Sequence, residues 1–433
     1  MAPWTNWAGT EAAEPRKVVT PDSIGQIVQE VEHAVAHRGT VKMVGTGHSF
    51  TGISAPVDTM LRPDHFTGIV SVDRDAMTVT ARSGTPLHVL NAELGRLGLS
   101  LHNMGDIAEQ TLAGATSTGT HGTGGTVASL SAQIAAFTMI TGHGEKVTAS
   151  PTSFREIFDA GRIGLGALGI LTEVTLFVEP LFALEAHERP MTWDELLSTY
   201  DELTHEHHHV DAYWFPHTER VMTKTNDRLA ELDGLLPLSR WRQWLDDEFL
   251  SNTVFGVLTS VGTHAPRAVP RLNRISGNAL SERSYSDISH RVFTSQRRVR
   301  FKEMEYAVPR EAGLEALREV RRVIGASSWL IGFPIEIRST PADDITLSTS
   351  SERDSMYLAF HVPAKADHTT YFAGVEQVLR GFDGRPHWGK MHTLEADDLA
   401  KVYPRFGEFL AIRDRLDPER VFTNPYLQRV LGD

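Results

Sequence analysis

The sequence predicts an α+β protein of two domains. Its 433 residues exceed the usual size of one domain, and a hydrophobic content of 41% is enough to fill more than one core. Short alternating apolar stretches predict strands along the chain, and stretches with helical spacing separate them. Three glycine-rich segments interrupt both patterns, which indicates that backbone groups line a binding site there.

The first predicted elements are a strand, a helix and a second strand. The strand at 18–20 leads into a helix with apolar residues at helical spacing, which Pro21 opens and Gly39 closes. A short apolar strand at 41–44 follows and ends in a glycine turn. This strand, helix, strand order suits a nucleotide site at the carboxyl end of the second strand.

Alternating and β-branched stretches predict the remaining strands of the first domain, which we place at 1–180. Gly142-His143-Gly144 forms the turn of a hairpin between two of them, and Pro180 marks the end of the domain. The predicted elements are strands at 77–81, 137–140, 146–149 and 170–178 and a helix at 86–97.

A second domain, 181–384, and a C-terminal segment, 385–433, complete the prediction. We expect the C-terminal segment to return to the first domain, and we assign no role to a charged segment with tryptophans at 229–249. The predicted elements are helices at 193–205, 311–324 and 399–416, the last stopped by Asp417-Pro418, and strands at 210–215, 220–225, 299–308 and 330–338.

Composition excludes several classes of function. The net charge of -13 argues against a general nucleic-acid binder, and Arg297, Arg298 and Arg300 are too few to form a basic face. The absence of cysteine removes disulfides, thiolate nucleophiles and cysteine-bound metals. Residues 1–15 lack the apolar core of a secretory signal, and no apolar run is long enough to span a membrane. We expect a cytoplasmic protein, with peripheral membrane contact left open.

The first glycine-rich segment carries a histidine. Its turn brings backbone N–H groups close to a phosphate, and the imidazole of His48 lies where a cofactor ring could be anchored. Alone, this turn would equally fit a hairpin with a surface histidine. The second segment interleaves glycines with threonines, so amides and hydroxyls converge there. The segments are 44–50, 101–106 with 118–125, and 161–170.

The third segment contains the Gly-x-Gly-x-x-Gly pattern of a Rossmann dinucleotide site at 164–169. That site requires a strand before the glycines and a helix after them. Here a helical stretch precedes them and a β-branched stretch follows, so we reject the Rossmann interpretation.

Together, the three segments resemble the FAD-binding domain of the vanillyl-alcohol-oxidase superfamily, which is of the PCMH type, in its sugar 1,4-lactone and alditol oxidase branch. The resemblance implies a two-domain flavoprotein with an α+β substrate or cap domain. It also implies that His48 is bonded to the 8α-carbon of the flavin, for which the imidazole must be largely unprotonated. The implied FAD-binding residues are Val44, Gly45, Thr46, Gly47, His48, Ser49, Gly105, Asp106, Gly114, Thr118, Gly119, Thr120, His121, Gly122, Gly166, Gly169 and Ile170.

The candidate catalytic residues begin with Glu336 and Arg338. On a strand they share one face, while Ile335 and Ile337 point to the other. A carboxylate beside a guanidinium can hold a polyol, although the pattern alone fits a structural ion pair equally well. The resemblance places a substrate-binding Glu-x-Arg pair at these two positions.

The resemblance also brings Lys390 into the active site, near the flavin N1–C2 edge or the substrate oxygen. There its charge would favour the reduced flavin and the deprotonated alcohol. Without the resemblance, Lys390 would be interpreted as an exposed charge on a turn. Glu303 and Glu305 share a strand face as well, and we rank them second.

A histidine cluster lies between the predicted helix at 193–205 and the strand at 210–215. The spacing of these residues matches no standard set of metal ligands, so we predict a solvated turn and no metal site. The histidines are His205, His207, His208 and His209.

The resemblance implies hydride transfer from a sugar-acid 1,4-lactone, such as L-gulono-1,4-lactone, to flavin N5, with an ascorbate-type product. One alternative is an oxidase of open alditols such as xylitol or sorbitol, and another is a protein that binds flavin without turnover. Alditol oxidases carry a serine at the position of Asp106, which favours the lactone. Gly105 would leave oxygen a path to the flavin, so both oxygen and a cytochrome or quinone type of acceptor stay open. The stereochemistry of the lactone and the oligomeric state are not predicted.

Overall fold

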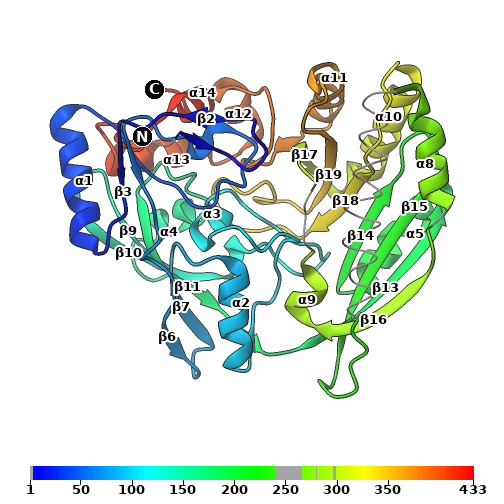
Figure 1. The fold of residues 1–433 in the computed structure, drawn as a ribbon, viewed down its shortest axis with the longest axis horizontal. Coiled ribbons are helices and arrows are strands. Elements are labelled where there is room, and N and C mark those ends of the chain that lie inside the picture. The colour runs from blue at the N-terminus through cyan, green and yellow to red at the C-terminus, as the bar shows by residue number, and fades with distance from the viewer. Residues whose placement is uncertain (1–2, 239–265, 279, 296–298) are drawn as a thin grey trace.

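The computed structural model describes residues 3–238, 266–278, 280–295 and 299–433. Two mixed helix and strand regions lie side by side (Figure 1), which confirms the predicted α+β class. Blue and cyan N-terminal segments and the red C-terminal helices form one region, and the green to orange middle of the chain forms the other. Of the segment at 229–249, residues 239–249 lie outside the described residues, as do Arg297 and Arg298.

The strand, helix, strand unit at the N-terminus is present as predicted. Ser23 caps the helix by accepting a hydrogen bond from the Gln26 N–H, and Arg38 ends it in the left-handed conformation with φ 50°. The flanking strands do not pair directly, because a third parallel strand lies between them. The elements are β3 (Lys17–Val19), α1 (Ile24–His37), β4 (Val41–Met43) and β5 (Thr59–Leu61).

A five-stranded antiparallel sheet, in the order β10-β9-β11-β7-β6, completes the region formed by the N-terminal segments and the C-terminal helices. We call this region the cofactor half, because it contains the three glycine-rich segments. It includes the predicted hairpin of β9 with β10, whereas the strand predicted from Met77 begins one residue later because Met77 has φ 49°. The elements are β6 (Ile69–Asp73), β7 (Thr78–Arg82), α2 (Leu87–Arg96), α3 (Leu112–Ser117), β9 (Ile134–Ile140), β10 (Lys146–Ala149), α4 (Arg155–Gly161) and β11 (Ile170–Phe177).

Two short strand pairs accompany these sheets. One joins residues near the N-terminus, and the other joins the strand after α2 to the segment where the chain leaves β11. The elements are β1 (Trp4–Thr5), β2 (Ala12–Ala13), β8 (Leu99–Ser100) and β12 (Glu179–Pro180).

An eight-stranded antiparallel sheet, in the order β16-β13-β15-β14-β18-β19-β17-β20, dominates the other half. The strand predicted at 330–338 starts only at Ile335, because Pro334 cannot donate a ladder hydrogen bond. The strands are β13 (Ala183–Thr192), β14 (His209–Trp214), β15 (Arg220–Leu229), β16 (Arg283–Ile288), β17 (Phe301–Pro309), β18 (Ile335–Thr340), β19 (Ser355–Pro363) and β20 (Arg385–Pro386).

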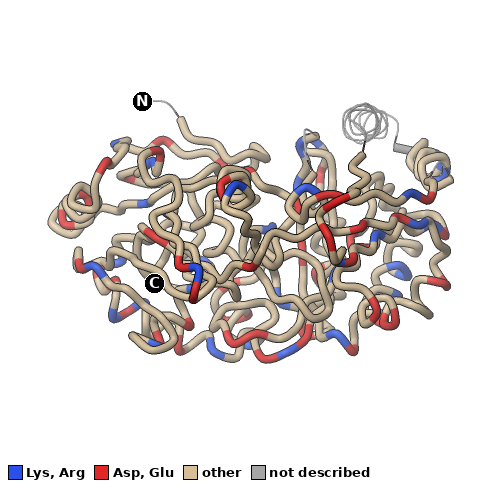
Figure 2. Tube along the Cα trace, turned by 90° about the horizontal axis from the view of Figure 1, so that it is seen from below, with Lys and Arg blue, Asp and Glu red and all other residues tan. Residues whose placement is uncertain are grey.

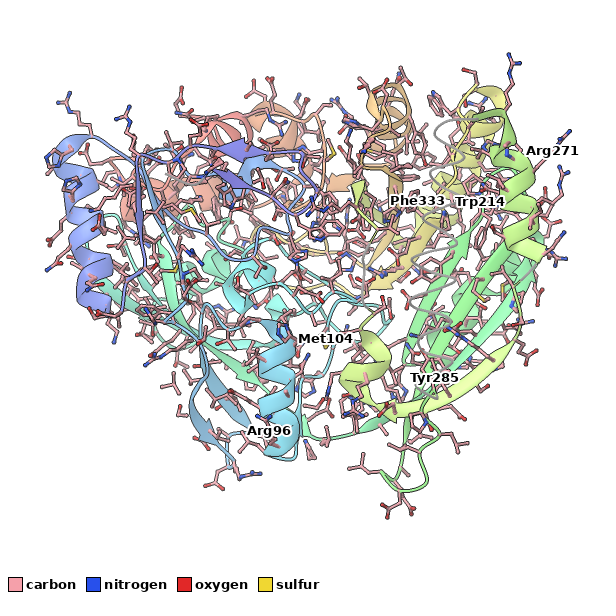
Figure 3. All side chains as sticks on the ribbon, in the orientation of Figure 1. Arg96, Met104, Trp214, Arg271, Tyr285 and Phe333 are labelled. Carbon is pink, nitrogen blue, oxygen red and sulfur yellow. The ribbon has the colours of Figure 1, made fainter. Side chains whose placement is uncertain are left out.

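Helices cover one face of this sheet and leave the other to the cofactor half. Apolar residues of three helices form one core with the sheet, in which Trp214 of β14 is buried (Figure 3). The opposite face carries the polar side chains described below. The helices of this half are α5 (Trp193–Glu206), α8 (Val269–Asn278), α9 (Ser289–Phe293), α10 (Gly313–Ala326) and α11 (Thr369–Arg380), and the core-forming ones are α5, α10 and α11.

The C-terminal segment packs into the core of the cofactor half, where Phe409 and Leu427 join residues of α2 and α3. The single helix predicted at 399–416 is wrong. The chain breaks it at Pro404, which removes an N–H donor and disfavours a helical conformation for the residue before it. The elements are α12 (Ala396–Val402), α13 (Phe406–Leu416) and α14 (Pro425–Leu431). The domain boundaries at 180 and 384 stay predictions.

Figure 2 shows acidic and basic residues interspersed along the described part of the chain, without a large patch of either charge in this view. Within the described part of the chain, no helix is both long enough and apolar enough to cross a membrane.

Glu179 joins the two halves at the point where the chain passes between them. Its carboxylate accepts hydrogen bonds from both terminal nitrogens of Arg228 on β15, at 2.5 and 2.6 Å, and lies 2.8 Å from Nδ1 of His102. Burial alone would raise the pKa of Glu179, but the bonds to Arg228 and His102 lower it to about 2.

We expect Glu179→Gln to lower the free energy of unfolding at pH 7 by about 1–2 kcal/mol, a value discounted for partial solvent screening. The folded pKa lies below the unfolded one, so the stabilisation is complete above pH 4.5 and is lost as the pH falls towards 2. Urea unfolding at pH 7, 4 and 3 measures this. Glu195→Gln, which removes a half-exposed pair with Arg189, is the control. A difference between wild type and Glu179→Gln that does not shrink below pH 4.5 would contradict the assignment.

Candidate active site

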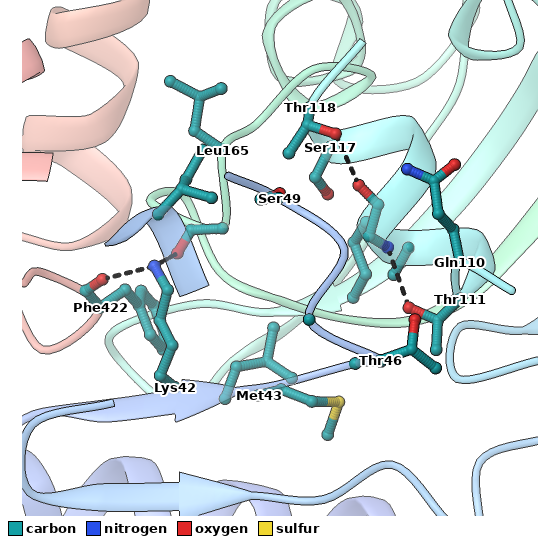
Figure 4. Close-up of a pocket in the computed structure, with 18 of the residues that line it drawn as sticks. Lys42, Met43, Thr46, Ser49, Gln110, Thr111, Ser117, Thr118, Leu165 and Phe422 are labelled. Carbon is teal, nitrogen blue, oxygen red and sulfur yellow. Dashed lines mark hydrogen bonds between the residues drawn. The ribbon is translucent and has the colours of Figure 1, made fainter. Parts of the chain in front are cut away.

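The predicted cofactor segments surround two adjoining cavities of about 110 and 50 Å³ that share His48, Ser49, Gln110 and Thr118. Val44, Gly119 and Gly122 line neither cavity. The larger one (Figure 4) is lined by the predicted residues Gly45, Thr46, Gly47, His48, Ser49, Gly114, Thr118, Gly166, Gly169 and Ile170. The smaller one is lined by Gly105, Asp106, Thr120, His121, Arg338 and Lys390, among others.

The backbone of the glycine turn after β4 approaches α3 closely. A Cβ atom at Gly45 would lie 2.3 Å from Oγ1 of Thr111, and Gly47 has φ 72°. Thr111 caps α3 by accepting from the Gly114 N–H, and the Thr118 hydroxyl donates to the Gly114 carbonyl (Figure 4). Small residues and hydroxyls therefore line a groove in which a dinucleotide can lie against bare backbone, so the residues present fit FAD.

Lys42 was not selected by the sequence analysis, although it lines the larger cavity. Its Nζ donates to the carbonyl oxygens of Gly166 and Phe422, at 3.0 and 3.1 Å (Figure 4). Burial lowers the pKa of Lys42 to about 7, with Asp417 opposing the shift. In the sequence, Lys42 stands out only as a lone lysine inside an apolar strand. Its role is not visible there, because the two carbonyl groups that it contacts lie more than a hundred residues from it in the chain.

His48 lies where the two cavities meet. Its ring stacks on Trp7, with ring centroids 5.7 Å apart and an interplanar angle of 23°. Burial lowers its pKa, Glu109 opposes this and Lys390 adds to it. His48 is therefore largely neutral at pH 7, the state that a nucleophilic imidazole requires.

The polar face of the eight-stranded sheet borders the smaller cavity. Ile335 and Ile337 are fully buried in the helix-covered core, so Glu336 and Arg338 share the opposite face, as predicted. Arg338 Nη2 donates to Glu336 Oε1 at 2.5 Å and Nε donates to Asp211 Oδ1 at 2.9 Å. Burial by itself would lower the pKa of Arg338, but these carboxylates raise it.

Lys390 is largely buried, with 19% of its side chain exposed, and it is paired, so it is not the exposed charge that its sequence context alone suggests. Its Nζ lies 2.5 Å from Glu303 Oε2 and 5.1 Å from the centroid of the Phe50 ring. Burial alone would lower the pKa of Lys390, but Glu303 and Glu305 raise it, while the pKa of Glu303 falls to about 2. Glu303 and Glu305, which the sequence ranks second, belong to the same charge cluster as Lys390.

In the described part of the chain, two buried groups have the residue types of a metal site: His121, Glu305 and His387, and Glu303, Glu336 and His361. In the first, His387 donates from Nε2 to the Gly119 carbonyl and accepts the Gly389 N–H at Nδ1. Neither of its nitrogens is open to a metal as arranged. In the second, Lys390 and Arg338 already supply the positive charge. The protein's own hydrogen bonds and cations thus account for both groups.

The histidine cluster is only partly a solvated turn. His207 and His208 face Asp227 at the surface, but His209 is fully buried at the start of β14. Its Nδ1 lies 2.7 Å from the Thr123 carbonyl oxygen, and burial lowers its pKa to about 4. The prediction was wrong for His209, because strand alternation turns this residue towards the second glycine segment.

Comparison with known proteins agrees with this geometry. Residues 15–150 match an FAD binding domain, and residues 174–430 match the D-arabinono-1,4-lactone oxidase family. The L-gulono-1,4-lactone dehydrogenase of Mycobacterium tuberculosis is 37% identical, with 100% of both chains covered. The L-gulonolactone oxidase of Mus musculus is 32% identical over 98% of this chain and 97% of its own.

The fold is also similar to that of a solved structure. Cholesterol oxidase from Brevibacterium sterolicum superposes with a TM-score of 0.82 at 17% identity, covering 99% of this chain and 96% of the other. The two family matches and the lactone-named relatives define an FAD-dependent oxidoreductase of the vanillyl-alcohol-oxidase type. Within that class, the chain belongs to the D-arabinono-1,4-lactone oxidase family.

Gly122 offers a test of the second glycine segment. An added Cβ would lie 2.3 Å from both Asn103 Oδ1 and the Met104 carbonyl oxygen. We expect Gly122→Ala to lower the free energy of unfolding by about 1–3 kcal/mol and to reduce the FAD bound per chain to roughly half or less, because overpacking displaces the loop. Flavin absorbance against protein concentration measures the loss. Gly332→Ala, where no heavy atom lies within 4 Å, is the control. Full FAD content in Gly122→Ala would contradict the expectation.

Proposed function

We propose that this protein oxidises a sugar-acid 1,4-lactone, such as L-gulono-1,4-lactone or a close stereoisomer, to an ascorbate-type product. The observation that carries the proposal is the pairing of Glu336 with Arg338 and of Glu303 with Lys390, largely out of contact with water, beside one cavity and next to His48. The two lactone-named relatives match this chain over nearly its whole length, which supports the same substrate class.

Each side chain then has a defined task. Bound FAD supplies the ring that accepts a hydride, at N5, from the carbinol carbon of the substrate. The hydroxyl proton of the substrate is lost to solvent as the hydride leaves, and Arg338 and Lys390 stabilise the negative charge that develops on the substrate oxygen. Lys390 can do so at neutral pH because its pKa is raised. Glu336 accepts hydrogen bonds from neighbouring hydroxyls and so orients the substrate.

The charges of the site favour a neutral substrate. Among the described residues around Arg338 and Lys390, the carboxylates of Glu303, Glu305 and Glu336 outnumber these two permanent cations. An additional carboxylate on the substrate would therefore be repelled. A lactone carries no such charge, whereas the hydrolysed aldonate does.

Two alternatives remain distinct from this proposal. An open alditol could use Glu336 and Arg338 as well, although the carboxylate of Asp106 stands where alditol oxidases carry a serine. A flavin binder without turnover would not need the buried pairs at all. For the reoxidation step, oxygen and a cytochrome or quinone type of acceptor are both retained, and cytoplasmic residence, with peripheral membrane contact as its alternative, stays the expectation.

Anaerobic bleaching of the flavin decides between these functions. Reduction by L-gulono-1,4-lactone supports the proposal, faster reduction by xylitol or sorbitol supports the alditol alternative, and no reduction by any of them supports the binder. Subsequent mixing with air or with cytochrome c identifies the acceptor.

His48 tests the covalent attachment of FAD. We propose a bond from its imidazole to the 8α-carbon of the flavin, which the neutral state of the ring and its place at the cavity support. His48→Ala should release its flavin in denaturant, whereas wild type keeps it through gel filtration in guanidinium. His33→Ala, a surface histidine of α1, is the control. Equal release from wild type and His48→Ala would refute the bond.

Arg338→Met should slow flavin reduction by the lactone about 10²–10³-fold, the usual cost of removing a group that stabilises developing charge. Stopped-flow absorbance under anaerobic conditions measures the rate constant, and flavin absorbance verifies that FAD content is kept. Arg310→Met, which removes an arginine paired with Asp201, is the control. An unchanged rate in Arg338→Met would remove this residue from the mechanism.

A further inference from the structure

Asp211 lies on β14, beside the strand that carries Arg338. β14 and β18 are antiparallel with Ala212 opposite Ile337, so the next position places Asp211 opposite Arg338 on the same face. The two side chains are 11% and 10% exposed, and the Arg338 Nε–H donates to Asp211 Oδ1 at 2.9 Å. This contact is therefore both buried and set by strand register.

Two carboxylates hold different nitrogens of the Arg338 guanidinium. Glu336 accepts from Nη2, while Asp211 accepts from Nε. A planar guanidinium held at one nitrogen can still swing, whereas bonds to Nε and Nη2 together fix its plane. Without Asp211, the group could turn towards Asp106, whose Oδ2 lies 3.9 Å from Nη2.

Asp211 is itself held by a row of charges that alternate across the sheet. Lys224 of β15 lies opposite Asp211, and Glu188 of β13 lies opposite Lys224. Burial alone would lower the pKa of Lys224, but Tyr285, Asp211 and Glu188 raise it. A cation thus flanks Asp211 on each side, which offsets the cost of burying its carboxylate.

We propose that Asp211 is a positioning residue that sets the plane of the Arg338 guanidinium, and with it the direction of the N–H groups that face the substrate. The proposal rests on the proposed function, in which Arg338 stabilises charge on the substrate oxygen. Arg338 lines the smaller cavity and Asp211 does not, so Asp211 acts through Arg338. Because a misplacement of about 1 Å can cost on the order of 10²-fold in rate, the effect is measurable.

Two variants distinguish the effect of the position of the Asp211 acceptor oxygen from the effect of the negative charge of its carboxylate. Asp211→Asn keeps an acceptor oxygen where Nε needs it, and we expect it to reduce flavin with lactone within roughly 5-fold of the wild-type rate constant. Asp211→Glu keeps the charge but moves the oxygens by one methylene group, and we expect a rate constant lower by about 30–100-fold. Flavin content should stay at the wild-type value in both. Asp201→Asn, which changes an exposed carboxylate paired with Arg310, is the matched control.

A double variant tests whether Asp211 acts through Arg338. In an Arg338→Met background, Asp211→Glu should lower the rate constant no further than roughly 3-fold, because the group to be positioned is gone. The proposal is overturned by the full single-variant loss in that background, by wild-type rates in Asp211→Glu, or by a larger loss in Asp211→Asn than in Asp211→Glu.

If the proposed lactone oxidation is wrong, the measurements give a result that differs from those expected for a failure of the Asp211 proposal. In that case the flavin of the wild-type protein itself is not bleached by any lactone, and the crystal structure of Asp211→Glu then decides about Asp211. A guanidinium that has turned away from its wild-type plane supports the positioning role. A guanidinium that has not moved overturns it.

Discussion

The structure depends on pairing buried charges across neighbouring strands. The side chains of Glu336, Arg338, Asp211 and Glu303 are at most 11% exposed, and that of Lys390 is 19% exposed. Isolated charges could not be buried there, because each would lose several kcal/mol of hydration. Strand alternation and register solve this problem for Arg338, which lies beside Glu336 and opposite Asp211, and the carboxylate of Glu303 solves it for the loop residue Lys390. The same pairs keep Arg338 and Lys390 protonated, and such cations can stabilise the negative charge that develops on an alcohol oxygen during oxidation.

The two halves of the molecule divide the work accordingly. Glycine segments of the cofactor half offer backbone and hydroxyls, which suit a phosphate and a flat ring. The sheet of the other half offers fixed side chains, and its helices keep the opposite face dry. Rigid strands hold catalytic groups more exactly in place than loops do. Lys390, by contrast, comes from a loop, and the carboxylate of Glu303 on β17 holds it in position.

The sequence was a good guide to local structure and a partial guide to the site. Alternation on β18 placed Glu336 and Arg338 on one face, and glycine turns located the cofactor segments. It failed where the decisive partner is distant in the chain. Lys42 meets carbonyl groups at 166 and 422, and Asp211 meets Arg338, pairings that only the topology of the sheets creates. Pro404, by contrast, is a purely local signal, and it separates α12 from α13 because it cannot donate a helical hydrogen bond.

The contact between Lys42 and the Phe422 carbonyl has a consequence for biosynthesis. One wall of the cofactor groove is contributed by a segment that leaves the ribosome long after the glycine turn at 45–48 has been made. The groove cannot close around its ligand before that segment has docked. Uptake of FAD should therefore be a late, post-translational event, and the nascent chain must keep an open groove until then.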